Sequence, residues 1–138
     1  MIVSESVPLL SQLLVHSATM LVTDDINRSV AFYRDLFGFA VRDHELSIAL
    51  LSLGSMLLYL VTESPPTPDK PSITLANTNA VARTSVNLVF RVSDCWAVYE
   101  DLKQRGVAFL TPPQSPAWGG WRCFARDPDG YLIEVEQI

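Results

Sequence analysis

The stretch VTDDINRSVAFYRDLFGFAV (Val22–Val41) decides the fold, because a second stretch, RVSDCWAVYEDLKQRGVAF (Arg91–Phe109), repeats its pattern. Each reads as the end of a strand, an aspartate, an amphipathic helix, a glycine and a new strand. The two aspartates, Asp25 and Asp94, lie 69 residues apart, half the length of the 138-residue chain. A repeat of this length predicts two copies of one supersecondary unit packed against each other.

The two aspartates are placed to cap the helices that follow them, by accepting backbone N–H bonds of the first turn. Around the helices, alternation and turn residues predict a βαβββ unit in each copy. The predicted fold is therefore α+β, with helices outside and strands curled into a shared cup. Strands are predicted over residues 15–23, 39–42, 47–53 and 55–61 in the first copy, and over 86–92, 107–110, 121–126 and 131–137 in the second.

The whole chain, residues 1–138, is predicted to be a single domain. Its first module covers about residues 14–62, and its second covers about 85–138. Residues 63–84 between them contain Pro65, Pro66, Pro68 and Pro71 and show no clear period. Such a segment is a linker, and the sequence leaves open whether it forms a lid or a contact between subunits.

Composition excludes several classes of protein. The net charge of −5 and the lack of any basic run argue against a nucleic-acid partner. The uncharged run Leu46–Thr62 is shorter than the ~20 apolar residues that a membrane span needs. The N-terminus lacks the basic start of a signal peptide, so a cytoplasmic protein is expected. Cys95 and Cys123 are expected to be free thiols.

Two motifs suggest a family. These are D-x-x-x-S-x-x-F-Y at Asp25–Tyr33 and DPDG-x-x-x-E at Asp127–Glu134. With the repeated βαβββ pattern they resemble the vicinal oxygen chelate superfamily, the group of glyoxalase I, extradiol dioxygenases, fosfomycin-resistance transferases and bleomycin-resistance proteins. The resemblance implies the glyoxalase/bleomycin resistance fold, and it implies a homodimer with cups at the interface. Because this scaffold hosts many activities, function must be argued from the site.

The resemblance also implies where a divalent metal would be held, by His and Glu side chains from four strands. The two histidine positions hold Ala18 and Asn87 here, whereas the glutamate of the last strand is kept as Glu134. A single carboxylate cannot hold such an ion, so no metal or other cofactor is expected. The alternative is a displaced site built from His16, Glu134 and either Glu136 or Asn87. His44 lies in a polar stretch that reads as a solvated turn.

Strand alternation then gives the residues expected to face the cup, and they form an amphipathic pocket. They are His16, Ala18, Met20, Asn87, Val89, Arg91, Leu132, Glu134 and Glu136. Glu134 and His16 are the candidate catalytic residues. The candidate ligand-binding residues are Met20, Asn87, Arg91, Trp118, Trp121 and Glu136. Trp118 and Trp121 flank Gly119-Gly120, where they either clamp a planar ligand or cover the core or a subunit contact.

Three hypotheses follow for the function. The first is a metal-free homodimer that binds a small organic molecule in its cup, as the family's bleomycin-resistance proteins do. The second is a metal-independent isomerase, cyclase or lyase that uses Glu134 with His16 or Arg91. The third is a metal-dependent lyase or dioxygenase with a shifted ligand set. The sequence leaves open whether the protein is an enzyme, and it predicts neither a nucleic-acid nor a membrane partner.

Overall fold

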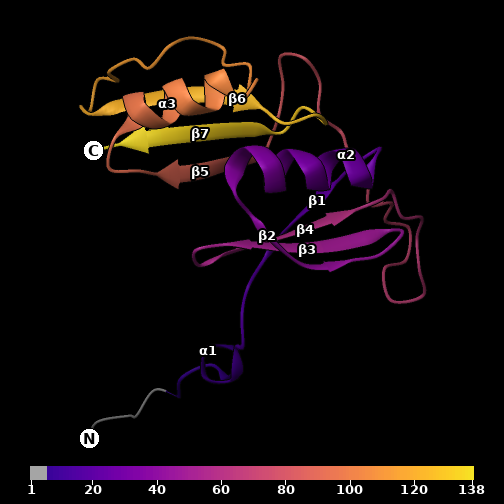
Figure 1. The fold of residues 1–138 in the computed structure, drawn as a ribbon. Helices are drawn as coiled ribbons and strands as arrows, with labels where there is room; N and C mark the ends of the chain where they lie inside the picture. The colour runs from indigo at the N-terminus through magenta and orange to yellow at the C-terminus, as the bar shows by residue number, and fades with distance from the viewer. Residues whose placement is uncertain (1–5) are drawn as a thin grey trace, which may run out of the picture.

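The computed structural model describes residues 6–138, which form two β-sheets, helices packed along them and a short helix that stands apart (Figure 1). The elements are α1 (Leu9–Leu13), β1 (Thr19–Val22), α2 (Ile26–Ala31), the π-helical turn η1 (Phe32–Leu36), β2 (Ala40–His44), β3 (Ile48–Leu53), β4 (Met56–Val61), β5 (Asn87–Arg91), α3 (Cys95–Gln104), β6 (Trp121–Arg126) and β7 (Leu132–Gln137). Within these residues no helix is long and apolar enough to cross a membrane.

Both predicted helix caps are confirmed. Asp25 accepts a hydrogen bond from the backbone N–H of Arg28 at 3.1 Å, and Asp94 accepts one from Ala97 at 3.0 Å. These bonds satisfy N–H groups that the first helical turn leaves without a partner. α2 continues into η1, and the chain then turns at Gly38, whose φ of +82° belongs to the left-handed region.

The strands form a first sheet in the order β1-β4-β3-β2 and a second in the order β5-β7-β6. In each sheet the strand before the helix pairs in parallel with the last strand of the unit, and the remaining pairs are antiparallel. This shared topology confirms the repeat that the sequence predicted. The strand predicted over residues 107–110 is reduced to an isolated bridge between Phe109 and Ala125.

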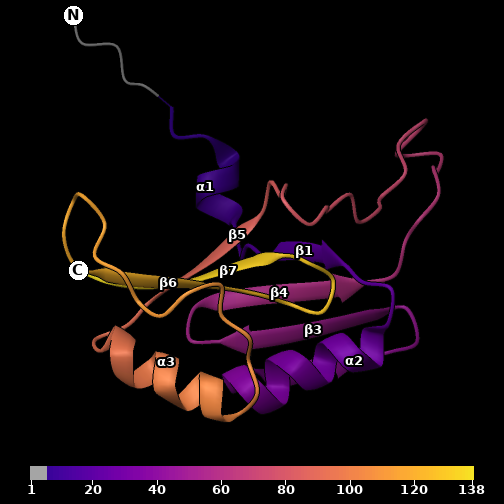
Figure 2. The ribbon, with the colours of Figure 1, turned by 90° about the horizontal axis from the view of Figure 1, so that it is seen from above.

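The helices and sheets form two layers. α2 and α3 lie in a row on one side of both sheets, and the edge strands β1 and β5 face each other (Figures 1 and 2). Helices outside the sheets are thus confirmed. Among the described residues no helix packs on the opposite side of either sheet, and we call this side the open face. Within residues 6–138 the two sheets stay separate, without closing into a barrel.

Two hydrophobic clusters fill the space between the layers. The first joins the two halves of the chain, because Leu88 and Ile133 of the second sheet pack with Ile26 and Val30 of α2. The second lies between α3 and the second sheet, and it includes Cys95 and Cys123. Their sulfur atoms lie 3.9 Å apart and both thiols are free, as predicted.

The structure corrects two local expectations. β1 begins at Thr19, whose pairing with Leu58 is the first of the β1–β4 ladder, so His16 and Ala18 precede the strand instead of lying in it. His44 belongs to β2, not to a turn, because it pairs with Ala49 of β3. Neither outcome is visible in the local sequence, since the length of a strand depends on the partner that it meets.

Candidate functional site

The open face of the second sheet carries the polar residues that the sequence predicted to face the cup. Glu134 of β7 pairs across the ladders with Val89 of β5 and with Phe124 of β6. Its side chain is 8% exposed, and its Oε1 accepts a hydrogen bond from Nδ2 of Asn87 at 3.0 Å. The structure therefore brings together two of the predicted site residues, Asn87 and Glu134.

A second pair of charges lies one step further along the same face. Nε of Arg91 lies 3.3 Å from Oε1 of Glu136, and Arg122 of β6 is directly opposite Glu136 in the ladder. The guanidinium of Arg122 lies over the rings of Phe124 and Trp118, at 5.2 and 5.7 Å from their centroids. Sequence reasoning left Arg122 out of the site, although its position on β6 has the parity of this face.

The two tryptophans around Gly119-Gly120 lie on opposite faces of the second sheet. Trp118 is half exposed beside Arg122, whereas Trp121 packs edge-on against Trp96 of α3, with ring centroids 5.8 Å apart. A clamp made of both rings on one ligand is therefore not formed. Glycine is required at residue 120, because a Cβ there would clash with the backbone oxygen of Gln137.

The open face of the first sheet is mostly apolar, with one polar pair, since Ser52 is opposite Leu57 in the β3–β4 ladder and accepts a hydrogen bond from Nε of Arg42 at 2.8 Å. Strand parity places Met20, Leu50, Leu57 and Tyr59 there, since their neighbours in the strands are buried under α2. Met20 is 45% exposed and pairs with Tyr59. The two open faces thus differ in chemistry: the first is mainly aliphatic and aromatic with the single Arg42–Ser52 hydrogen bond, and the second carries paired charges.

The residues present do not fit the metal that the family resemblance implies. Ala18 has no donor, and Asn87 points its Nδ2 at Glu134 as a hydrogen-bond donor. The displaced alternative is not assembled either. His16 is exposed, and within residues 6–138 no three His, Cys, Asp or Glu side chains come together as a metal-binding group. Three or so ligands are needed for such a site.

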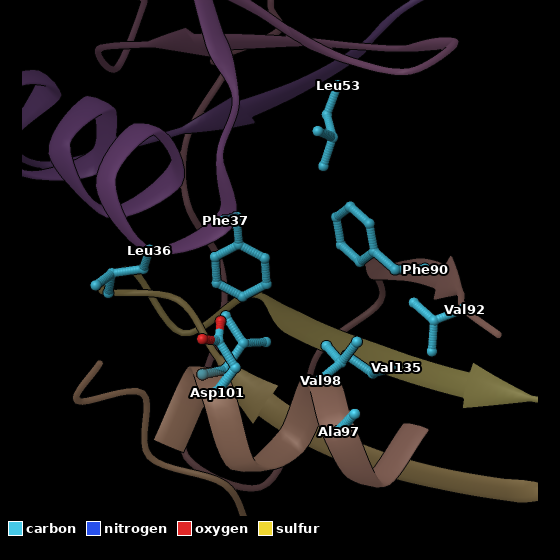
Figure 3. A pocket seen from close by; sticks show the side chains of 10 residues that line it. Leu36, Phe37, Leu53, Phe90, Val92, Ala97, Val98, Asp101 and Val135 are labelled. Atoms are coloured by element: carbon cyan, nitrogen blue, oxygen red, sulfur yellow. The ribbon is translucent and has the colours of Figure 1, made fainter. Parts of the chain in front are cut away.

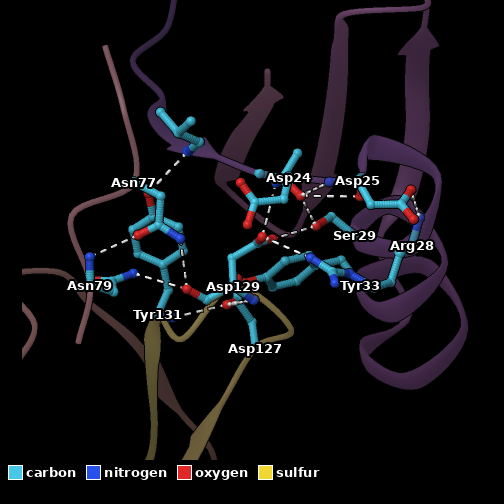
Figure 4. A network of polar contacts seen from close by, with 12 residues as sticks. Asp24, Asp25, Arg28, Ser29, Tyr33, Asn77, Asn79, Asp127, Asp129 and Tyr131 are labelled. Carbon is cyan, nitrogen blue, oxygen red and sulfur yellow. Dashed lines mark hydrogen bonds and ion pairs between the residues drawn. The ribbon is translucent and has the colours of Figure 1, made fainter. Parts of the chain in front are cut away.

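The two sequence motifs meet at a different place, as Figure 4 shows. Asp129 of the DPDG turn accepts hydrogen bonds from Nη2 of Arg28 and Oγ of Ser29, both at 2.8 Å. Asp127 accepts one from the hydroxyl of Tyr33 at 2.6 Å. The motif residues of the first unit are thus bonded to those of the second. These motifs hold the two halves of the chain together and lie outside the polar open face.

Burial dominates the electrostatics of this contact. It raises the pKa of the Asp127 carboxyl, although hydrogen bonds from Tyr33 and from two backbone N–H groups act in the opposite direction. Burial, together with the neighbouring Asp127, raises the pKa of Tyr33 well above its ordinary value. The linker also contacts the DPDG turn, because Nδ2 of Asn77 donates a hydrogen bond to the backbone oxygen of Asp129 at 2.8 Å.

A separate cavity of about 380 Å³ lies on the helix side, between the C-terminal end of η1 and α3 (Figure 3). Its one charged lining residue, Asp101, is exposed and pairs with Arg105 at 2.9 Å. A cavity with no buried polar group has little to orient a ligand, so we place the candidate site on the open face. The cavity is lined by Leu36, Phe37, Leu53, Phe90, Val92, Ala97, Val98, Asp101, Leu102 and Val135.

Comparisons with known proteins agree with this fold. The uncharacterized protein YraH of Bacillus subtilis (strain 168) is 28% identical over 125 residues, covering 86% of this chain and 94% of that protein. A probable lactoylglutathione lyase of Vibrio parahaemolyticus is 26% identical over 127 residues, covering 86% and 87%. The crystal structure of a glyoxalase/bleomycin resistance protein/dioxygenase from Nocardioides superposes with a TM-score of 0.69 at 22% identity, covering 94% of this chain and 89% of that one.

The family model described as the glyoxalase/bleomycin resistance protein/dioxygenase superfamily matches residues 14–135, nearly the whole chain. The repeated unit of a strand, a helix and further strands, and the strand order of both sheets, agree with that match. The chain therefore belongs to the glyoxalase/bleomycin resistance protein/dioxygenase superfamily.

Proposed function

We propose that this protein binds a small organic molecule on its open face, as a homodimer and without a metal ion. The observation that carries the proposal is the nearly buried Glu134, hydrogen-bonded to Asn87, in the middle of an otherwise accessible sheet face. A carboxylate held in this way is suited to binding a hydroxyl or cationic group of a ligand. Two free cysteines are consistent with a cytoplasmic protein.

The ligand we propose is planar, with a hydroxyl or cationic substituent. Arg122 already lies over Trp118 and Phe124, which indicates that this part of the face accepts flat, polarizable groups. We propose that Trp118 contacts the ligand, because the ring of Trp121 packs against Trp96 of α3 instead. The aliphatic face of the first sheet would supply the apolar wall.

In the proposed dimer, a second copy of the chain covers the ligand, which a single chain leaves accessible on its open face. Met20 and Val89 are 45% and 43% exposed on the open face, and a pocket that holds a small molecule usually covers most of its surface. If the apolar face of one copy lies opposite the polar face of another, the result is an amphipathic cup shared by two subunits. A closed dimer of this kind presents the same contact twice.

A second candidate is a metal-independent isomerase, cyclase or lyase in which Glu134 moves a proton. The burial of Glu134 favours it, because a general base works best when it is shielded and held within reach of one proton. Arg91, on the same face, would stabilise negative charge on the substrate. A lyase of the lactoylglutathione type, suggested by the name of the Vibrio relative, is disfavoured because Ala18 and Asn87 replace the implied metal ligands.

Calorimetric titration with planar aromatic compounds that carry hydroxyl or amine groups tests the proposal. Glu134→Gln should weaken binding roughly tenfold to 100-fold, the value of a hydrogen bond to a charged group. The matched control is Glu100→Gln, an exposed glutamate of α3 on the helix side, which should bind like the wild type. Equal loss in both variants, or none in Glu134→Gln, would contradict the assignment.

Metal content provides a separate check. The protein is incubated with Zn²⁺, Mn²⁺, Fe²⁺ or Ni²⁺, desalted, and analysed for retained metal. Metal bound in stoichiometric amount would refute the metal-free reading. Conversion of the bound compound, blocked in Glu134→Gln, would favour the enzyme over the binding protein.

A further inference from the structure

Arg122 of β6 carries a positive charge that no carboxylate of the described chain balances. Glu136 is directly opposite Arg122 in the β6–β7 ladder, yet the Glu136 carboxylate pairs with Arg91 at 3.3 Å. Within residues 6–138 the Arg122 guanidinium takes part in no ion pair and donates no hydrogen bond. Because a guanidinium stays charged at every pH at which proteins fold, its N–H donors are available to an acceptor from outside the chain.

A cavity of about 270 Å³ lies beside this guanidinium, between β6 and residues 110–116. β6 is an edge strand of the second sheet, and the chain before it runs along its edge. Gln114 and Arg122 exchange two backbone hydrogen bonds there, each 2.9 Å long. The cavity wall includes Thr111, Gln114 and Ser115 from this segment and Arg122 and Phe124 from β6. Unlike the cavity on the helix side, it therefore combines a cation with several polar side chains.

Two of these polar side chains have hydrogen-bonding groups to offer. The hydroxyl of Thr111 already donates to the backbone oxygen of Pro112 at 2.8 Å. The side chains of Gln114 and Ser115, in contrast, form no hydrogen bond among the described residues. An amide N–H and a hydroxyl next to a guanidinium are donors of the kind that bind an anionic oxygen. The cavity thus has the chemistry of a site for an anion.

Aromatic rings hold the guanidinium of Arg122 in place. Its central carbon lies 5.2 Å from the ring centroid of Phe124 and 5.7 Å from that of Trp118. Contacts of this type attract the cation without using its N–H donors. They also restrict a long and flexible side chain before any ligand is present, so less conformational entropy is lost on binding. Arg122 is therefore prepared to bind an anion.

We propose that this cavity is an anion subsite, in which the guanidinium of Arg122 binds the carboxylate of a planar aromatic acid. The two oxygens of a carboxylate match two parallel N–H groups of a guanidinium. The inference rests on the proposed function and deepens it, because the same ligand would offer its hydroxyl or cationic group to Glu134. Phe124, directly opposite Glu134, is two residues from Arg122 on β6. The two ends of the ligand are then separated by roughly 6.5 Å along the strand.

Charge favours a carboxylate over a phosphate. The chain has a net charge of −5, and Glu134 and Glu136 lie on the same face as Arg122. One guanidinium balances the single charge of a carboxylate. A phosphate monoester carries about −1.5 to −2 at neutral pH and needs a second cation. Arg91 does not supply that cation, because it is paired with Glu136.

Calorimetric titration at neutral pH with naphthoate and its uncharged analogue naphthamide tests the subsite. The two compounds share their ring and nearly their shape, so the ratio of their Kd values reports the contribution of the carboxylate. Naphthoate should bind roughly tenfold to 100-fold more tightly than naphthamide, the value of hydrogen bonds to a charged group. In Arg122→Gln this preference should disappear.

Arg105→Gln is the matched control. Arg105 is an exposed arginine on the helix side, paired with Asp101 at 2.9 Å, so its loss should leave the preference for naphthoate unchanged. The fold of Arg122→Gln is checked by urea unfolding. Its midpoint should stay close to that of the wild type, because the hydrogen bonds between Arg122 and Gln114 are made by the backbone.

Three results would overturn the subsite. They are naphthoate binding no tighter than naphthamide to the wild type, a preference that survives in Arg122→Gln, and naphthyl phosphate binding more tightly than naphthoate. The proposed function fails by a different result, an unchanged affinity of Glu134→Gln for hydroxynaphthamide. If that affinity is unchanged while Arg122→Gln loses its preference, the anion subsite stands and the role of Glu134 falls. The opposite pattern would keep the role of Glu134 and refute the subsite.

Discussion

Removing the hydroxyl of Tyr33 should destabilise the protein more than its small size suggests. Tyr33→Phe deletes one oxygen that donates to Asp127 at 2.6 Å, in a place where the tyrosine is 0% and the aspartate 5% exposed. A hydrogen bond to a charged group contributes about 1.5–3 kcal/mol, and a buried acceptor left without its donor adds a desolvation cost. Because Asp127 keeps its two backbone N–H donors, we expect a loss of about 2–3 kcal/mol.

Equilibrium unfolding in urea at neutral pH measures this loss as a lower midpoint with an unchanged slope. Tyr99→Phe is the control, because Tyr99 is also buried in a hydrophobic cluster but its hydroxyl has no hydrogen-bond partner within residues 6–138. That variant should stay within about 0.5 kcal/mol of the wild type. If Tyr33→Phe also stays within that range, the bond to Asp127 does not help to hold the two halves of the chain together.

Three further predictions concern ionisation, backbone and thiols. Because burial raises the pKa of Asp127 in the folded state, the folded protein binds more protons than the unfolded chain between the ordinary carboxyl pKa of about 3.9 and the raised value. The ionisation of Asp127 therefore lowers the free energy of unfolding as pH rises through that window. In Asp127→Asn the urea midpoint should no longer show this decrease with rising pH. Gly120→Ala should destabilise more than Gly119→Ala in thermal unfolding, since both residues have positive φ but only the first would bring a Cβ against the backbone of β7; equal losses would exclude the clash. Finally, Cys95 and Cys123 should resist a thiol reagent at pH 8 until urea unfolds the chain, and rapid labelling of the native protein would contradict their burial.

The sequence by itself determined the local elements. Asp25 and Asp94 specify helix starts through their own side chains, and the DPDG turn specifies the hairpin between β6 and β7. Such features depend on residues only a few positions apart, so they can be read from one stretch of chain. The repeat of these features predicted the α+β fold, and together with the motifs at Asp25–Tyr33 and Asp127–Glu134 it carried the resemblance to the family.

The tertiary structure alone decided which chemistry these elements bring together. Tyr33 donates a hydrogen bond to Asp127, 94 residues away in sequence, and no residue near either of them in the sequence predicts this bond. Trp118 and Trp121 are three residues apart, yet the pleat and the packing of α3 send them to opposite faces. His16 lies outside the strand in which it was predicted, because the β1–β4 ladder starts only at Thr19. The physical reason is the same in each case: capping and turns are local interactions, whereas faces, strand ends and buried polar partners depend on what distant segments pack against them.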